Sequence, residues 1–322
     1  MKIYFQKAMV VLSLFLSATP LLACDLCNLY LSINPNDFQH SINLNYRYRS
    51  QSAMLAAGPQ FRKLHSGSGY FSENTLAEER FQTLDVWANF FPVQKVQLSV
   101  AVPITQHDML YNSKSAYQLS GVGDITLIGL YQVHNTTCDT VNVYRQRLSI
   151  GGGVKLPTGA YKTTDEDNQP YNPHMQIGTG STDAILATEY LARFKNWGFS
   201  TNLTYRMSSR NAMGYAFANR FNTTSHFFYL QQLFEGELSI MPKLGFYYEQ
   251  AENDLQNQDL VRDSGGKVLM GSFGGSVFWK KFSLSGLYQP VLNEDLYGKQ
   301  FPNDPRFIFS ITWFIPSKFV SM

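Results

Sequence analysis

Apolar and polar side chains alternate along the chain with a period of two, and residues 38–49 show this pattern most clearly. In an extended strand the two sets would lie on opposite faces, whereas a helix would scatter both sets around its axis. A tilted strand of about 9–11 residues is long enough to cross a bilayer. The apolar face comprises Phe38, His40, Ile42, Leu44, Tyr46 and Tyr48, and the polar face Gln39, Ser41, Asn43, Asn45, Arg47 and Arg49.

The same alternation recurs down the chain and predicts eleven further strands. Single-chain barrels of the bacterial outer membrane have an even number of strands. We therefore predict an all-β fold, a transmembrane antiparallel up-and-down β-barrel of about 12 strands. The further strands are expected at 84–90, 96–105, 124–132, 147–156, 181–193, 197–208, 223–234, 237–249, 267–279, 282–290 and 305–314.

Short and long connections alternate between the predicted strands. Outer-membrane barrels have short periplasmic turns and longer external loops. With an even strand number, both termini then lie in the periplasm. Trp87, Trp197, Trp279 and Trp313 fall near strand ends on that side, as expected for tryptophan at a membrane interface. Short turns are expected near 92–93, 195–196, 235–236 and 280–281, and long polar loops at 51–77, 158–180 and 250–266.

The composition narrows the class of protein further. The 322 residues include 24 Phe, 19 Tyr and 4 Trp, while charged residues make up only 16%. This excludes a disordered chain, and the net charge of +2 gives no sign of a nucleic-acid partner. Beyond the N-terminal segment, no apolar run approaches the roughly 18 residues of a spanning helix. A soluble all-β sandwich would leave the aromatic content and the loop lengths unexplained.

The first 23 residues have the features of a secretory signal peptide. Lys2 and Lys7 precede an apolar stretch, and Leu21-Leu22-Ala23 offers a cleavage site before Cys24. An uncleaved anchor helix is the alternative, and Leu21 to Cys24 also resembles a lipoprotein box in which the cysteine is acylated. The predicted organisation is a signal peptide over 1–23, a periplasmic segment over 24–37, a β-barrel over 38–314 and a tail over 315–322.

Three cysteines fall on the predicted periplasmic side. Cys24 and Cys27 form a Cys-x-x-Cys pair, and Cys138 lies in the predicted turn 134–143. The periplasm is oxidising, so Cys27 and Cys138 form a disulfide if Cys24 is acylated. If Cys24 is not acylated, Cys24 and Cys27 either form a disulfide or hold a soft metal such as copper. A third alternative is that the cysteines have no role.

Two histidines on the predicted external side form a further candidate metal site. His107 and His174 lie beside Met109 and Met175 in the sequence, and His and Met together suit copper. Loop histidines are more often plain solvated side chains. We expect no cofactor, and no catalytic arrangement of side chains stands out.

The polar face of each strand should point into the barrel. Its charges of opposite sign nearly balance, so no ring of a single sign is expected to select ions. A barrel of 12 strands lies between small filled barrels and open porins, so we expect a narrow lumen with ion pairs. These residues either hold the barrel shape or bind solute. The candidates are Arg47, Arg49, Asp85, Asp124, Arg147, Lys155, Asp183, Glu189, Arg206 and Lys243.

Three glycine-rich segments, in their order and spacing, carry a family resemblance. They are Gly-Val-Gly-Asp-Ile-Thr-Leu at 121–127, Gly-Val-Lys-Leu-Pro-Thr-Gly at 153–159 and Gly-Thr-Gly-Ser-Thr-Asp at 178–183. The set resembles the outer-membrane transporters named for the meta-cleavage pathway of phenol degradation, which are distantly similar to hydrophobic-compound channels of the fatty-acid-transporter type. The resemblance implies an outer-membrane barrel. The segment 24–37 is too short for the hatch domain that plugs the fatty-acid transporters.

We therefore expect a passive, non-enzymatic channel in the outer membrane of a Gram-negative bacterium, for small hydrophobic or aromatic solutes. Its expected partners are outer-membrane lipid, the solute and the barrel assembly machinery, with no nucleic acid. The alternatives are a copper-type metal-handling protein or a structural barrel that uses the N-terminal Cys-x-x-Cys pair.

Overall fold

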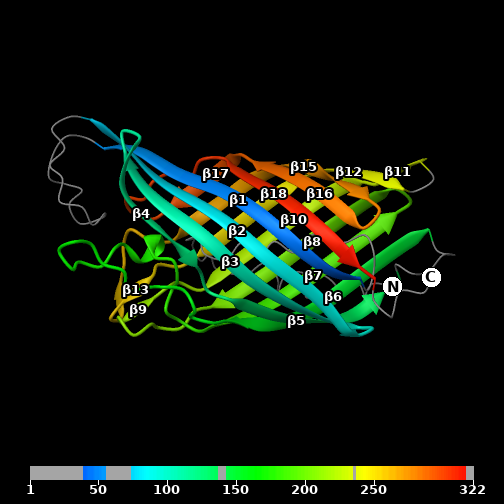
Figure 1. The fold of residues 1–322 in the computed structure, drawn as a ribbon, viewed down its shortest axis with the longest axis horizontal. Helices are drawn as coiled ribbons and strands as arrows, with labels where there is room; N and C mark the ends of the chain where they lie inside the picture. Colours follow the sequence, from blue (N-terminus) through cyan, green and yellow to red (C-terminus); the bar gives the residue numbers. More distant parts are fainter. Residues whose placement is uncertain (1–38, 56–73, 137–142, 235–236, 317–322) are drawn as a thin grey trace, which may run out of the picture.

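The computed structural model describes residues 39–55, 74–136, 143–234 and 237–316, which form a closed antiparallel β-barrel (Figure 1). Twelve strands make its wall, which confirms the predicted fold class and strand number. Wall neighbours are neighbours along the chain, so the connectivity is up-and-down. The wall strands are β1 (His40–Leu55), β2 (Thr75–Val93), β3 (Val96–Tyr111), β5 (Thr126–Asn135), β6 (Tyr144–Lys155), β7 (Asp183–Phe194), β8 (Trp197–Met207), β10 (Arg220–Tyr229), β12 (Leu238–Ala251), β15 (Gly266–Trp279), β16 (Phe282–Gln289) and β18 (Arg306–Ile315).

The barrel closes where β1 meets β18. Their antiparallel register runs from His40 opposite Ile315 to Tyr48 opposite Phe307. Closure leaves no sheet edge with unpaired N–H and C=O groups, which a bilayer cannot satisfy. Below, the base is the end of the barrel with His40 and Ile315, and the mouth is the opposite end.

Side chains along the wall alternate between the outside and the lumen. In β1, Leu44 is exposed on the outer face while Asn43 is buried in the lumen. In β18, Phe309 is exposed and its neighbour Ser310 is buried. Large exposed apolar side chains continue around the outer wall. An outer band of this kind needs lipid around it.

Three of the four tryptophans lie where the sequence suggested. Trp197, Trp279 and Trp313 are exposed at the ends of β8, β15 and β18 near the base. The expectation for Trp87 is wrong, because this side chain is only 6% exposed and packs inside the barrel with Ile128. The cause is register: the outward positions of β2 fall on the residues before and after Trp87, so the indole points inward.

Three wall strands are interrupted. Strand β4 (Lys114–Val122) and β5 both pair with β3 and together make one wall strand. Strand β11 (Gln231–Leu233) prolongs β10 beside β12. Strand β17 (Val291–Leu296) prolongs β16 beside β15, and the break lies at Pro290, which has no N–H for the ladder.

Strands β1 to β3 extend further toward the mouth than the sequence predicted. In β2 the outward residues of this extension include Glu78 and Arg80, which pair at 3.0 Å. Beyond the apolar band both faces of the strand carry polar side chains. The alternation therefore no longer marks the strand there.

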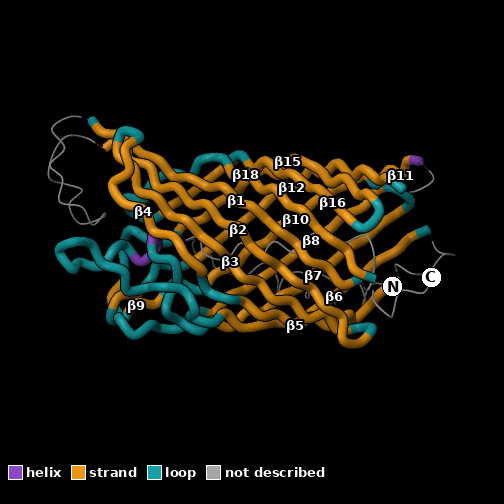
Figure 2. The backbone as a smooth tube through the Cα atoms, viewed as in Figure 1, coloured by secondary structure: helices purple, strands orange, loops and turns teal. Residues whose placement is uncertain are grey.

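The described connections at the base are short and most of those at the mouth are long, as predicted. The exception at the mouth is the two-residue turn Asn112-Ser113 between β3 and β4. Tight turns join Phe194 to Trp197 and Trp279 to Phe282 at the base. At the mouth, the connections fold over the opening and include the small sheet of β9 (Tyr215–Ala216), β13 (Leu255–Gln256) and β14 (Asp259–Leu260) (Figure 2). Within the described part of the chain, no helix has the length and apolar character needed to span a membrane.

One prediction concerns the close approach of neighbouring strands. A Cβ atom added at Gly151 in β6 would collide with the carbonyl oxygen of Gly129 in β5. We expect Gly151→Ala to lower the free energy of unfolding in lipid vesicles by about 1–3 kcal/mol, as overpacking does elsewhere. Gly286→Ala is the control, because the nearest side-chain atoms of Phe309 lie 3.7 Å away. Equal urea midpoints for the two variants would contradict this account.

Candidate functional site

The segment between β6 and β7, residues 156–182, folds into the mouth of the barrel. The loop contains a 3-10 turn, η2 (Pro173–Met175). Met175 is fully buried against the inward face of β1, β2 and β3, where it contacts a cluster that includes Phe81 and Met109. The carbonyl oxygen of Met175 lies 3.0 Å from Nδ1 of His107 in β3. This mouth loop therefore narrows the lumen.

A buried ion-pair network anchors the mouth loop to the wall. The ammonium group of Lys155, at the end of β6, lies 2.7 Å from Oδ2 of Asp124 and 3.2 Å from Oδ2 of Asp183. It also donates to the hydroxyl of Thr179 and to the carbonyl oxygen of Ser181 in the loop. Asp183 directly follows the loop, whereas Asp124 lies in the connection between β4 and β5. Removing one partner would leave the others charged and buried, which is costly.

Asp124 binds both ends of the mouth loop at once. Its Oδ1 accepts the Gly159 N–H at 3.0 Å, and its Oδ2 accepts the Thr179 N–H at 2.9 Å. At the other side of the network, Arg206 in β8 lies 3.6 Å from Asp183. The structure thus brings together four of the lumen residues singled out by the sequence.

The three glycine-rich segments of the sequence meet at this anchor. The Thr158 hydroxyl donates to the Gly123 carbonyl oxygen, and the Ile125 N–H donates back to the Thr158 hydroxyl. A Cβ at Gly159 would lie 2.7 Å from Cα of Gly178, so only glycines allow the two ends of the loop to touch. These segments therefore shape and hold the loop.

A second set of contacts ties the loop to its neighbours at the mouth. Nε2 of His174 lies 2.6 Å from Oδ2 of the fully buried Asp254, and the Tyr215 hydroxyl donates to the same oxygen. Burial alone would raise the pKa of Asp254. The His174 charge, hydrogen bonds from His174 and Tyr215 and the Ala218 N–H outweigh burial and hold this pKa below its usual value.

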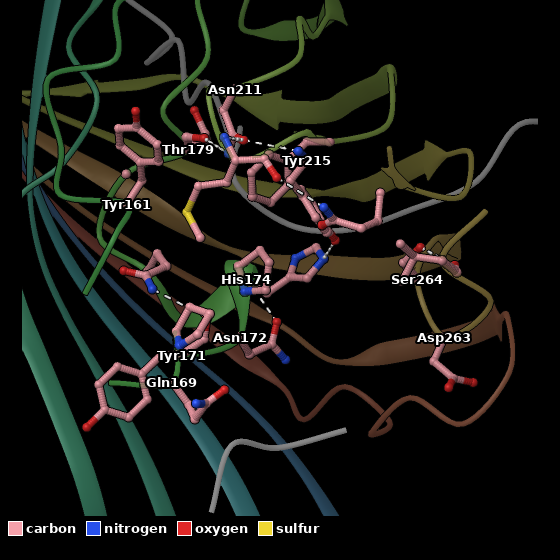
Figure 3. Close-up of a pocket in the computed structure, with 18 of the residues that line it drawn as sticks. Tyr161, Gln169, Tyr171, Asn172, His174, Thr179, Asn211, Tyr215, Asp263 and Ser264 are labelled. Carbon is pink, nitrogen blue, oxygen red and sulfur yellow. Dashed lines mark hydrogen bonds between the residues drawn. The ribbon is translucent and has the colours of Figure 1, made fainter. Parts of the chain in front are cut away.

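A cavity of about 800 Å³ opens between these mouth segments (Figure 3). Aromatic rings of Tyr161, Tyr171 and Phe217 line it together with Met213. Carboxylates such as Asp263 lie at its rim, and the described lining residues include no lysine or arginine. The arrangement suits a neutral, ring-containing solute that also accepts or donates hydrogen bonds.

The other lumen candidates lie further from the loop anchor. Arg47 pairs with Asp85 at 3.6 Å across β1 and β2. Arg49 stacks over the Phe81 ring at 3.7 Å. Arg147 in β6 lies diagonally from Glu189 in β7, because its direct partner is Leu191 and that of Glu189 is Ser149. Lys243 lies on the inward face of β12.

Sequence reasoning missed two buried arginines. Arg220 pairs with Glu249 at 3.6 Å, and Arg306 lies over the Tyr247 ring at 4.9 Å. The strand expected at 223–234 began too late to include Arg220, although it shares the parity of the inward Asn222. Arg306 shares the parity of Ser310 in β18, and that signal was available.

The proposed metal and disulfide residues give a mixed picture. Cys24, Cys27 and Cys138 lie outside the described residues, so their pairing stays a prediction. His107 in β3 contacts the backbone carbonyl of Met175, and His174 contacts Asp254. Among the residues that the structure describes, no three His, Cys, Asp or Glu side chains are grouped to hold a metal ion.

Comparison with known proteins agrees with the barrel fold. A family model described as "Putative MetA-pathway of phenol degradation" matches residues 56–295. No curated protein matches the chain. An outer membrane channel from Pseudomonas putida F1 is similar in structure, with a TM-score of 0.61 at 13% identity over 91% of this chain and 100% of that one. At this identity the likeness shows the fold.

Two further solved structures are more distant. The beta domain of the Bordetella autotransporter BrkA has a TM-score of 0.45 at 12% identity, over 86% of this chain and 99% of that one. A Pseudomonas aeruginosa FadL homologue has a TM-score of 0.38 at 9% identity, over 85% of this chain and 90% of that one.

The anchor leads to a prediction for Lys155. We expect Lys155→Met to lower the free energy of unfolding by about 3–5 kcal/mol, because it leaves two buried carboxylates without their main cation. Amide hydrogen exchange in 156–182 should accelerate more than exchange in β1 and β2. Lys162→Met removes an exposed lysine from the same loop and is the control. Unchanged exchange in the loop of Lys155→Met would refute the anchor.

The contacts of Asp254 predict a response to acid. Because the pKa of Asp254 is below its ordinary value of 3.8, the charged form stabilises the folded mouth. The stabilisation by charged Asp254 is complete at pH values above the ordinary pKa. It is lost as the pH falls through the lowered pKa. The Ala218 amide, which donates to Asp254 at 2.8 Å, should stay protected from exchange until that acid range. Loss of its protection near neutral pH would contradict the assignment.

Proposed function

The chain belongs to the family named for the MetA pathway of phenol degradation, and we propose that it is a passive outer-membrane channel for small hydrophobic or aromatic solutes. The observation that carries this proposal is the aromatic cavity at the mouth. Its volume of about 800 Å³ falls within the roughly 300–1,000 Å³ range of small-molecule sites. The rings of Tyr161, Tyr171 and Phe217 offer flat apolar surfaces to a ring-shaped solute.

Apolar side chains continue from the upper lumen toward the base. Trp87, Ile128 and Ile185 belong to one inward-facing cluster on β2, β5 and β7. Further down β7, Leu191 joins a second cluster that includes Phe228 of β10. A hydrophobic solute that leaves the mouth cavity therefore finds apolar wall on its way, which supports passage of such solutes over sugars.

The topology follows from the same proposal. The mouth, with its long connections, faces the outside of the cell, and the short turns and both termini face the periplasm. Residues 1–23 act as the signal peptide and the barrel assembly machinery inserts the barrel. The segment 24–37, with Cys24 and Cys27, lies in the periplasm, and its disulfide, lipid or metal chemistry stays a prediction.

Uptake by cells tests the proposal. The cells are a porin-deficient Gram-negative strain with intact lipopolysaccharide, which keeps the lipid route slow. We expect the wild-type chain to raise uptake of labelled p-cresol several-fold and uptake of arabinose much less. Met213→Trp fills the cavity and should remove most of the gain in p-cresol uptake.

Met54→Trp is the matched control, because Met54 is 64% exposed on the outer face of β1 near the mouth. It should leave p-cresol uptake at the wild-type level. Equal uptake by cells with and without the chain would exclude the channel. Equal effects of the two tryptophan variants would exclude the cavity as the site of solute capture.

A further inference from the structure

One buried cation of the lumen has no counter-charge among the residues that the structure describes. Lys243 lies on the inward face of β12 and is 5% exposed. The cations Lys155, Arg206 and Arg220 are each within 4 Å of a carboxylate. In contrast, the structure shows no described carboxylate in an ion pair with Lys243. An ammonium group buried in this way calls for an anion.

Polar groups that carry no negative charge lie on the mouth side of Lys243. The next inward position on β12 is Gly245, which lies opposite His226 of β10 and Ser272 of β15. Nε2 of His226 is 2.8 Å from the Ser272 hydroxyl, and both side chains are buried. An anion near Lys243 would therefore meet hydrogen-bonding groups and no opposing carboxylate among them.

Apolar side chains lie on the base side of Lys243. Phe228 lies directly opposite it on β10, and Met241 is its inward neighbour on β12. Both belong to the buried cluster with Leu191 and Leu230, against which Phe278 packs. Lys243 thus stands at the border between an apolar wall and a polar one.

The inward position beside Lys243 on β15 is a glycine. The residue opposite Lys243 on β15 is Gly274, which has no side chain and is exposed although it lies on the inward face. The exposed glycine leaves lumen space beside the buried lysine.

We propose that Lys243 and the cluster of Phe228, Met241 and Leu191 form a binding site for an apolar monocarboxylate. The carboxylate pairs with the ammonium group of Lys243, and the ring or short chain packs on the cluster. Neither the carboxylate nor the apolar part of the ligand suffices for binding alone, because Lys243 lies at the edge of the apolar wall. This names a solute class for the lower lumen that the mouth cavity does not reveal.

The site rests on the proposed channel function for its route of access, while binding itself does not require flux. The carboxylates at the mouth rim include Asp167, which is exposed. Salt screens exposed charges over about 8 Å at physiological ionic strength. The rim carboxylates therefore weaken the passage of an anion with an apolar body but do not prevent it.

Equilibrium dialysis of labelled benzoate against the full-length protein in detergent tests the site. We expect one benzoate per chain, displaced by cyclohexanecarboxylate and at least about tenfold less well by acetate or benzyl alcohol. Lys243→Met removes the charge and keeps an apolar stem of similar length, and it should weaken benzoate binding by at least about tenfold. Lys280→Met, at an exposed base turn, should bind benzoate like the wild type.

Wild-type affinity in Lys243→Met, or displacement by acetate as strong as by cyclohexanecarboxylate, would overturn the proposal. If Lys243→Met does not fold, the wild type decides: benzoate should slow reductive methylation of Lys243 and leave that of Lys280 unchanged. Slowing of methylation at neither lysine, or equal slowing at both, would refute the site. Benzoate binding without p-cresol uptake would reject the channel alone, and p-cresol uptake without benzoate binding would reject this site alone.

Discussion

In a bilayer, backbone N–H and C=O groups must be hydrogen bonded within the chain, and the rest of this structure depends on that constraint. The pairing of β1 with β18 meets it, because it closes twelve wall strands into a ring without an edge. Closure fixes the faces of every strand, since side chains alternate. Apolar residues then face lipid, and polar and charged residues are confined to a lumen of limited width.

Confinement of charge explains how the mouth loop is held. Charged side chains inside a narrow lumen cannot be solvated fully, so they pair. Lys155 does so with Asp183, which directly follows the mouth loop, and with Asp124, which lies between β4 and β5. Asp124 also accepts N–H groups from both ends of the loop, so the network draws the loop to the wall. The loop in turn shapes the aromatic cavity. The function proposed here therefore depends on a few buried charges as much as on the apolar surfaces that meet solute.

The strands, their faces and most lumen charges could be predicted from the sequence, because a period of two is a local property. The anchor could not: the sequence places Asp124, Lys155 and Asp183 in the lumen, but their meeting depends on how 156–182 folds back. Likewise, Asp254 and Tyr215 come from segments without alternation and meet His174 only in three dimensions. Arg220 was missed for a simpler reason, since its strand was expected to begin three residues later.

The most direct test locates a solute in the protein. Crystals of the protein soaked with 4-bromophenol would be measured at the bromine absorption edge, where anomalous scattering marks the ligand. The account predicts a bromine peak in the mouth cavity, beside Tyr171 and Phe217. Bromine found only on the outer, lipid-facing wall would contradict the claim that solutes are captured at the mouth.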